Sequence, residues 1–247
     1  TLVPNAISIL SATLKKAGFK NIELFDTTFY ESDGLSKDQD RVKVGQVQPF
    51  NFDEKNIQLK KSDMYEDFIK KVENFNPDII FASVVEDTYP IFINFMNAIK
   101  EKKIACLVGG VFPSSAPEKV IKLDFVDYVC RGEGEGALVD LANALEENKD
   151  PTNIKNLWVK KNGKIVSRNS IRPALDVNTL PVQDLSIFED ISLHRPMMGK
   201  IYRMAPVETQ RGCPYACRFC NSPEKNEFYN AQKAGRFFRK RTMEHIH

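Results

Sequence analysis

Three clustered cysteines are the residues of this sequence whose type and spacing best suit metal chemistry. Cys213, Cys217 and Cys220 form the pattern C-x3-C-x2-C. Soft thiolates at such short spacing can converge on one iron–sulfur cluster from a single loop. Three ligands on a four-iron cluster leave one iron without a protein ligand, which indicates chemistry rather than simple electron transfer. A zinc site would need a fourth Cys or His, and only His245 and His247 lie downstream.

The cysteine count as a whole argues against a disulfide framework. There are five cysteines, an odd number, and the other two, Cys106 and Cys130, fall inside apolar runs where packed thiols are expected. This usage fits a reducing compartment. The sequence shows neither a signal-peptide pattern nor an apolar run of membrane-spanning length. We therefore predict a cytoplasmic protein without a membrane partner.

Ahead of the cysteines, short apolar runs alternate with amphipathic segments. The runs are typical of strands buried on both faces of a sheet, and the amphipathic segments carry apolar residues at helical spacing. Strands are predicted over residues 21–26, 78–83, 104–108 and 125–130, and helices over 7–16, 62–75, 89–102, 117–122 and 136–147. The alternation predicts an α/β fold with a doubly wound parallel sheet. The polar residues 31–60 are predicted to form a long surface loop.

The composition changes after Pro151. Two strand-like runs flank Lys161-Asn162-Gly163, a pattern typical of a β-hairpin with an Asn-Gly turn. Residues 170–200 contain three prolines and little periodicity, which indicates a linker. Residues 206–210 are predicted to be a strand that runs directly into the cysteine motif.

The cysteine motif after a strand, with the aromatic Phe219 before its last cysteine, resembles the radical S-adenosylmethionine (SAM) superfamily. The resemblance implies a [4Fe–4S] cluster on Cys213, Cys217 and Cys220, with SAM bound at the open iron and Phe219 near the adenine. It also implies that the reduced cluster cleaves SAM to methionine and a 5′-deoxyadenosyl radical. An electron donor such as flavodoxin or ferredoxin would then be a partner.

The first half of the chain resembles the cobalamin-binding domain that is often fused ahead of radical SAM barrels. The resemblance is carried by Gly109-Gly110-Val111-Phe112-Pro113-Ser114 and by Arg131-Gly132-Glu133-Gly134-Glu135. It implies a Rossmann-like cobalamin-binding α/β domain over 1–150, a hairpin and proline-containing linker over 151–200, and over 201–247 the first strand and loop of a radical SAM partial TIM barrel. On this resemblance the chain is an amino-terminal fragment that lacks most of the barrel and cannot turn over substrate alone.

The ends of the predicted strands are where a ligand of such a sheet is expected. Residues without side chains let the backbone approach a flat macrocycle, and helix starts can meet a phosphate. The positions implied for cobalamin are Ser83, Gly109, Gly110, Gly132, Glu133 and Gly134. The simpler alternative is that these glycines only turn the chain.

One departure from the family concerns the cobalt ligand. Many cobalamin domains carry an Asp-x-His-x-x-Gly motif whose histidine binds cobalt from below. Here the matching segment reads Asp26-Thr27-Thr28-Phe29-Tyr30, and no histidine precedes His194. Bound cobalamin is therefore expected to lack a histidine ligand from this domain.

Charge gives little indication of a macromolecular partner. The net charge is only +2, so no whole-chain argument for nucleic acid follows. A basic cluster near the end is interpreted as a solvated helix entrance rather than a nucleic-acid patch; it comprises Lys233, Arg236, Arg239, Lys240 and Arg241.

The leading hypothesis is a cobalamin-dependent radical SAM enzyme that carries out methyl transfer or a related radical reaction. Its substrate is expected to be a small molecule, and the sequence identifies neither that molecule nor a catalytic side chain. One alternative is a cobalamin-binding or redox-sensing module without catalysis. Another is a methylthiotransferase, whose amino-terminal domain would supply three further cysteines where this chain has only Cys106 and Cys130.

Overall fold

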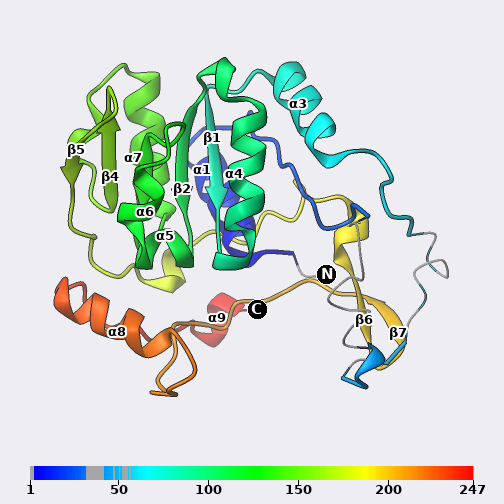
Figure 1. Ribbon diagram of the computed structural model, residues 1–247. Coiled ribbons are helices and arrows are strands. Elements are labelled where there is room, and N and C mark those ends of the chain that lie inside the picture. The colour runs from blue at the N-terminus through cyan, green and yellow to red at the C-terminus, as the bar shows by residue number, and fades with distance from the viewer. Residues whose placement is uncertain are drawn as a thin grey trace.

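The computed structural model describes residues 3–31, 42–46, 48–49, 51, 55 and 57–246. Its centre is a sheet with the strand order β1-β2-β3-β4-β5 (Figure 1). These strands are β1 (Ile79–Ser83), β2 (Ala105–Gly109), β3 (Tyr128–Cys130), β4 (Leu157–Lys161) and β5 (Lys164–Arg168). The first three strands run parallel, and the last two join antiparallel. Much of the predicted loop at 31–60 lies outside the described residues.

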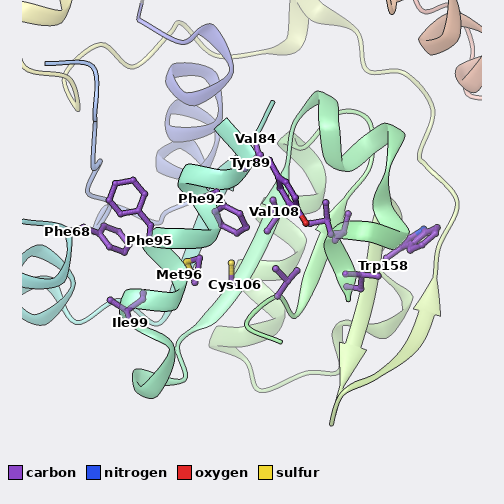
Figure 2. Packing of buried hydrophobic residues seen from close by; sticks show 14 of the residues in the cluster. Phe68, Val84, Tyr89, Phe92, Phe95, Met96, Ile99, Cys106, Val108 and Trp158 are labelled. Carbon is purple, nitrogen blue, oxygen red and sulfur yellow. The ribbon is translucent and has the colours of Figure 1, made fainter. Parts of the chain in front are cut away.

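Helices cover both faces of this sheet, which confirms the predicted doubly wound arrangement. One face carries α3 (Met64–Phe75), α4 (Tyr89–Ala98), α5 (Val111–Ser115) and α6 (Pro117–Ile121), and the other carries α1 (Asn5–Lys16) and α7 (Glu135–Glu146). Figure 2 shows Phe92 and Phe95 of α4 among the residues that pack over Cys106 and Val108 of β2. The apolar runs form strands because both of their faces are covered in this way.

The predicted hairpin is confirmed, and it completes the sheet. Asn162 and Gly163 both have positive φ, 50° and 74°, as a tight turn between β4 and β5 requires. Trp158 of β4 pairs with Val129 of β3. The sheet therefore extends past residue 150 into the part of the chain that also holds the linker.

The prediction of a strand over residues 21–26 is wrong. These residues form no ladder in the structure, although Ile22 and Phe25 pack against the two sides of the core. Alternation of polar and apolar residues reports which side chains are buried, and an extended segment can satisfy it without pairing.

The second half contains further short elements. The linker includes an unpredicted hairpin of β6 (His194–Met197) and β7 (Lys200–Arg203). The strand predicted at 206–210 is reduced to β8 (Gln210–Arg211), which pairs antiparallel with β9 (Arg239–Lys240). Helices α8 (Ser222–Ala231) and α9 (Met243–Ile246) complete the described chain. None of the helices in the described ranges is long and apolar enough to span a bilayer.

Asp184 ties the linker to the first helix. Its carboxylate accepts a hydrogen bond from Ser11 at 2.6 Å and pairs with Lys15 at 2.6 Å. Burial alone would raise the pKa of this carboxyl, but hydrogen bonds from Lys15, Ser11 and Ser186 outweigh it and lower the pKa to about 2. The linker thus has a defined attachment to the α/β domain.

This attachment is expected to weaken in acid. A carboxyl whose pKa is lowered by folding contributes stability above its unfolded pKa and loses it as pH falls toward the folded value. Between about pH 5 and pH 2, the unfolding free energy of the wild type should therefore fall by about 1 kcal/mol more than that of Asp184→Asn, after allowance for solvent screening. Urea titrations across this range measure the difference. Parallel pH profiles would contradict the expectation.

Candidate functional site

The carboxyl ends of the parallel strands place the predicted cofactor positions next to one another. Ser83 pairs with Gly109 in the β1–β2 register, and a Cβ on Gly109 would lie 3.5 Å from the Cβ of Cys130 at the end of β3. Ser83 is exposed, whereas Gly109 is half-buried. In Figure 1 this end of the sheet faces α8 and α9, so the cysteine-bearing part of the chain lies beyond it. An open edge of this kind is where α/β sheets bind ligands.

Gly110 makes the turn that leaves β2. Its φ of 108° and ψ of −169° lie in a region open essentially to glycine alone. A Cβ at this position would also lie 2.7 Å and 2.8 Å from the backbone oxygen and nitrogen of Val84. The close approach of the two loops therefore requires glycine.

Ser114 joins this turn to the loop after β3. Its hydroxyl donates to the carbonyl of Gly110 at 2.8 Å and accepts from the backbone N–H of Gly132 at 3.0 Å. The sequence alone indicates no role for Ser114. Its position four residues after Gly110, which allows a back-bond to the preceding helical turn, was the available signal.

The remaining glycines pack against the protein. A Cβ on Gly132 would lie 3.5 Å from both Asn156 and Tyr229, and one on Gly134 would lie 3.3 Å from Leu138. Gly132 also has a φ of 75°. The side of each glycine on which a Cβ would project therefore faces the chain itself, and any close approach by a ligand is to the opposite side of the backbone.

Glu133 lies in a largely buried arginine–glutamate cluster. Its carboxylate binds Arg239 at 2.7 Å and 2.9 Å and Arg211 at 3.1 Å, and it accepts the backbone N–H of Leu175 at 3.1 Å. Burial raises the pKa of Glu133, but the two guanidinium groups outweigh it, so the pKa is lowered. The cluster contains three arginines and three glutamates: Arg211, Arg239, Arg241, Glu133, Glu135 and Glu208.

This cluster corrects the interpretation of the basic segment near the end of the chain. Arg239 and Arg241 are not on a solvated helix entrance, because their side chains are only 14% and 7% exposed and pair with Glu133 and Glu208. The sequence alone does not identify either arginine as a buried structural cation. No local signal could have found them, since their partners are tens of residues away.

The cysteine loop follows β8 directly. Gly212, with a φ of 83°, lies so close to the segment just before β9 that a Cβ would collide with the carbonyl of Phe237. Cys213 is half-buried, and Cys217 and Cys220 are exposed. Phe219 is 95% exposed. In the described part of the chain, no three Cys, His, Asp or Glu side chains lie close enough together to hold a metal.

One thiol of this loop, that of Cys220, differs chemically from the two in the sheet. The hydroxyl and the backbone N–H of Ser222, at the start of α8, lower the pKa of Cys220. Burial raises the pKa of Cys106, and it raises that of Cys130 to about 12. Because metals bind the thiolate form, the donor chemistry favours the exposed loop over the sheet.

Helix α8 is attached to the α/β domain by stacked side chains. The guanidinium of Arg131 lies between the rings of Trp158 and Phe228, 5.2 Å and 4.6 Å from their centroids. Tyr229 is buried and packs against Phe237. These contacts hold the segment after the cysteines against the loop that contains Gly132.

The segment Asp26-Thr27-Thr28-Phe29-Tyr30 forms a local turn. Asp26 accepts hydrogen bonds from the N–H and hydroxyl of Thr28, at 2.9 Å and 2.6 Å, and closes a local turn. The hydroxyl of Tyr30 donates to Asp67 at 3.1 Å. No side chain of this turn is an imidazole.

Comparison with known proteins identifies related chains. Residues 1–142 match the family model described as B12 binding domain. The chain is 28% identical over 166 residues to an uncharacterized methyltransferase from Pyrococcus horikoshii, covering 64% of this chain and 34% of the relative. It is 25% identical over 174 residues to an anaerobic magnesium-protoporphyrin IX monomethyl ester cyclase from Rubrivivax gelatinosus, covering 67% and 31%. The matched regions thus span about a third of these relatives.

Solved structures share the fold. The radical SAM methyltransferase TsrM from Kitasatospora setae aligns with 100% of this chain and 41% of its own, with a TM-score of 0.61 at 16% identity. The cobalamin-dependent SAM radical enzyme OxsB aligns with 89% of this chain and 26% of its own, with a TM-score of 0.61 at 21% identity. At these identities the likeness establishes the architecture, and it confirms the predicted Rossmann-like α/β fold.

Proposed function

This chain belongs to the B12 binding domain family, and from that premise we propose that it is the cobalamin-holding part of a radical SAM enzyme. In this proposal Cys213, Cys217 and Cys220 bind a [4Fe–4S] cluster, and SAM binds at the open iron. The whole protein then carries out methyl transfer or a related radical reaction on a small molecule. An electron donor such as flavodoxin or ferredoxin belongs to the same proposal.

The observation that carries the proposal is the contact between the two candidate sites. The loop after β3 contains Gly132 and Glu133. It contacts the turn at Gly109-Gly110 (the G-G turn) through Ser114, and it contacts the strand before the cysteines through Arg211. A fold that only shared the family's architecture would not require the strand before a cysteine loop to be fixed to the loop after β3. The arrangement suits an enzyme in which two cofactors meet.

The residues of the chain have separable tasks in this proposal. Ser83, Gly109 and the backbone of residues 132–134 would hold cobalamin at the open edge of the sheet. The carboxylate of Glu133 is already engaged by two arginines, so we assign it to holding the cysteine strand. The exposed ring of Phe219 is available to pack on the adenine of SAM. When bound, cobalamin supplies a cobalt that can carry a methyl group.

The experiment that tests cobalamin binding uses this chain directly. Hydroxocobalamin is added and the protein is passed through a gel-filtration column. The expected result is a coloured protein whose visible spectrum differs from that of free cobalamin. Because no histidine is available near residues 26–30, the spectrum should lack the signature of a histidine-bound cobalt. A colourless protein fraction would overturn the cobalamin assignment.

A further inference from the structure

Glu133 connects the two candidate sites through direct hydrogen bonds. On one side its neighbour Gly132 donates to Ser114, which in turn donates to Gly110. On the other side its own carboxylate binds Arg211 and Arg239. Displacement of the loop around Glu133 therefore affects both the G-G turn and the β8–β9 ribbon.

The paired strands β8 and β9 (the β8–β9 ribbon) connect Glu133 to the cysteines. Arg211 and Arg239 lie opposite each other in the β8–β9 pair, so one carboxylate holds both strands. Arg211 is followed directly by Gly212 and Cys213, and Gly212 lies against the backbone of Phe237. A shift of Arg211 cannot be absorbed before the first cysteine, because no flexible residue with free space intervenes.

The ion pairs of Glu133 with Arg211 and Arg239 are buried enough to hold one fixed geometry. The side chains of Glu133, Arg211 and Arg239 are 11%, 18% and 14% exposed. In such an environment an unpaired charge is strongly unfavourable, so the carboxylate and the guanidinium groups hold a single arrangement. Surface ion pairs of the same domain, such as Glu118 with Arg168, are about half exposed and lack this constraint.

We propose that Glu133 couples the two binding events, so that a cluster on the cysteine loop raises the affinity for cobalamin and cobalamin raises the affinity for the cluster. This inference rests on the proposed function. Because the ion pairs fix the loop around Glu133 and the ribbon relative to each other, a ligand that restricts the motion of one also restricts the other, and the second ligand has less motion left to restrict. Such coupling between binding sites is reciprocal. Glu133 is a positioning residue in this scheme, since it acts through Arg211.

The test measures hydroxocobalamin affinity by absorbance titration in two states of the wild-type chain. One state is anaerobically reconstituted with iron and sulfide, and the other is stripped with a chelator. The cluster-loaded state is expected to bind at least about five-fold more tightly. Hydrogen exchange of the amides of residues 212–220 should slow when cobalamin is added to the iron-free chain.

Variants separate coupling from simple structural support. In Glu133→Gln the affinity ratio between the two states should fall to about one, and cobalamin should no longer slow exchange in the cysteine loop. Glu118→Gln makes the same chemical change in an exposed pair and should keep the wild-type ratio. A purely structural role for Glu133 would weaken binding in both states alike and leave the ratio unchanged.

A second variant covers the case in which Glu133→Gln fails to fold. Arg211→Lys keeps the positive charge but removes the guanidinium fork that spans Glu133, Glu135 and Glu208. It should fold, as judged by circular dichroism, and reduce the ratio. Equal cobalamin affinities in the two states of the wild type would overturn the coupling alone. So would a folded Glu133→Gln variant that keeps the wild-type ratio of these affinities. Failure of the wild type to bind either group would overturn the proposed function itself.

Discussion

Replacing Cys217 by alanine is expected to remove the iron–sulfur cluster from this chain. After anaerobic reconstitution the wild type should hold about four iron atoms per chain, and the variant should hold close to none. The reason is that a loop with three ligands has no spare thiolate, and the other two thiols are buried in the sheet. Iron analysis and the broad visible absorption of the cluster provide the measurement.

The two thiols of the sheet supply the control for this experiment. Cys130 is 2% exposed, and burial raises its pKa to about 12, so it is neither accessible nor ionised near neutral pH. Cys130→Ala should therefore retain the full iron content of the wild type. If Cys217→Ala bound as much iron as Cys130→Ala, the assignment of the cluster to the exposed loop would be refuted.

Gly110→Ala is expected to damage the α/β domain more than any ordinary glycine replacement. The substituted residue would have to adopt a φ of 108° while its Cβ pressed against the backbone of Val84. Backbone cannot move aside as the end of a flexible side chain can. We expect a loss of roughly 3 kcal/mol or more in unfolding free energy, together with loss of cobalamin retention.

Gly18→Ala is the matched control for the backbone conformation. Gly18 has nearly the same φ, 109°, but has nothing within 4 Å of the position of a Cβ. It should lose only about 1–2 kcal/mol, which is the cost of positive φ by itself. Denaturant titration of both variants isolates the steric part. Equal losses in the two variants would show that the contact with Val84 has no energetic weight.

The features that the sequence predicted well are those specified by nearby residues. The Asn-Gly turn is specified within a few residues, and its φ values of 50° and 74° confirm it. The C-x3-C-x2-C spacing is equally local, and the ligand set proposed from it stays a prediction. Buried strands and amphipathic helices are also recognised from the apolar periodicity of a few neighbouring residues. The order of these elements then favoured a doubly wound sheet, which the structure and the family match bear out.

The features that the sequence did not predict depend on where distant segments meet. Residues 21–26 alternate like a strand but have no partner strand, and only the packed structure reveals this. The sequence alone predicts that Gly110 and Gly132 let a ligand approach, yet each glycine also has a packing reason, in Val84 or Tyr229. The ion pair of Arg211 with Glu133 is likewise not predicted from the sequence, because the two residues are 78 positions apart.

The sequence by itself therefore determined the α/β class and the cysteine spacing from which a ligand set is proposed, since spacing and periodicity are properties of short segments. Only the tertiary structure decided that Glu133 faces Arg211 and Arg239 rather than solvent or a ligand. The physical reason is that a buried charge must find its opposite charge wherever folding brings one close, and no local pattern encodes that meeting. The same contact fixes the strand before the cysteine loop to the loop after β3.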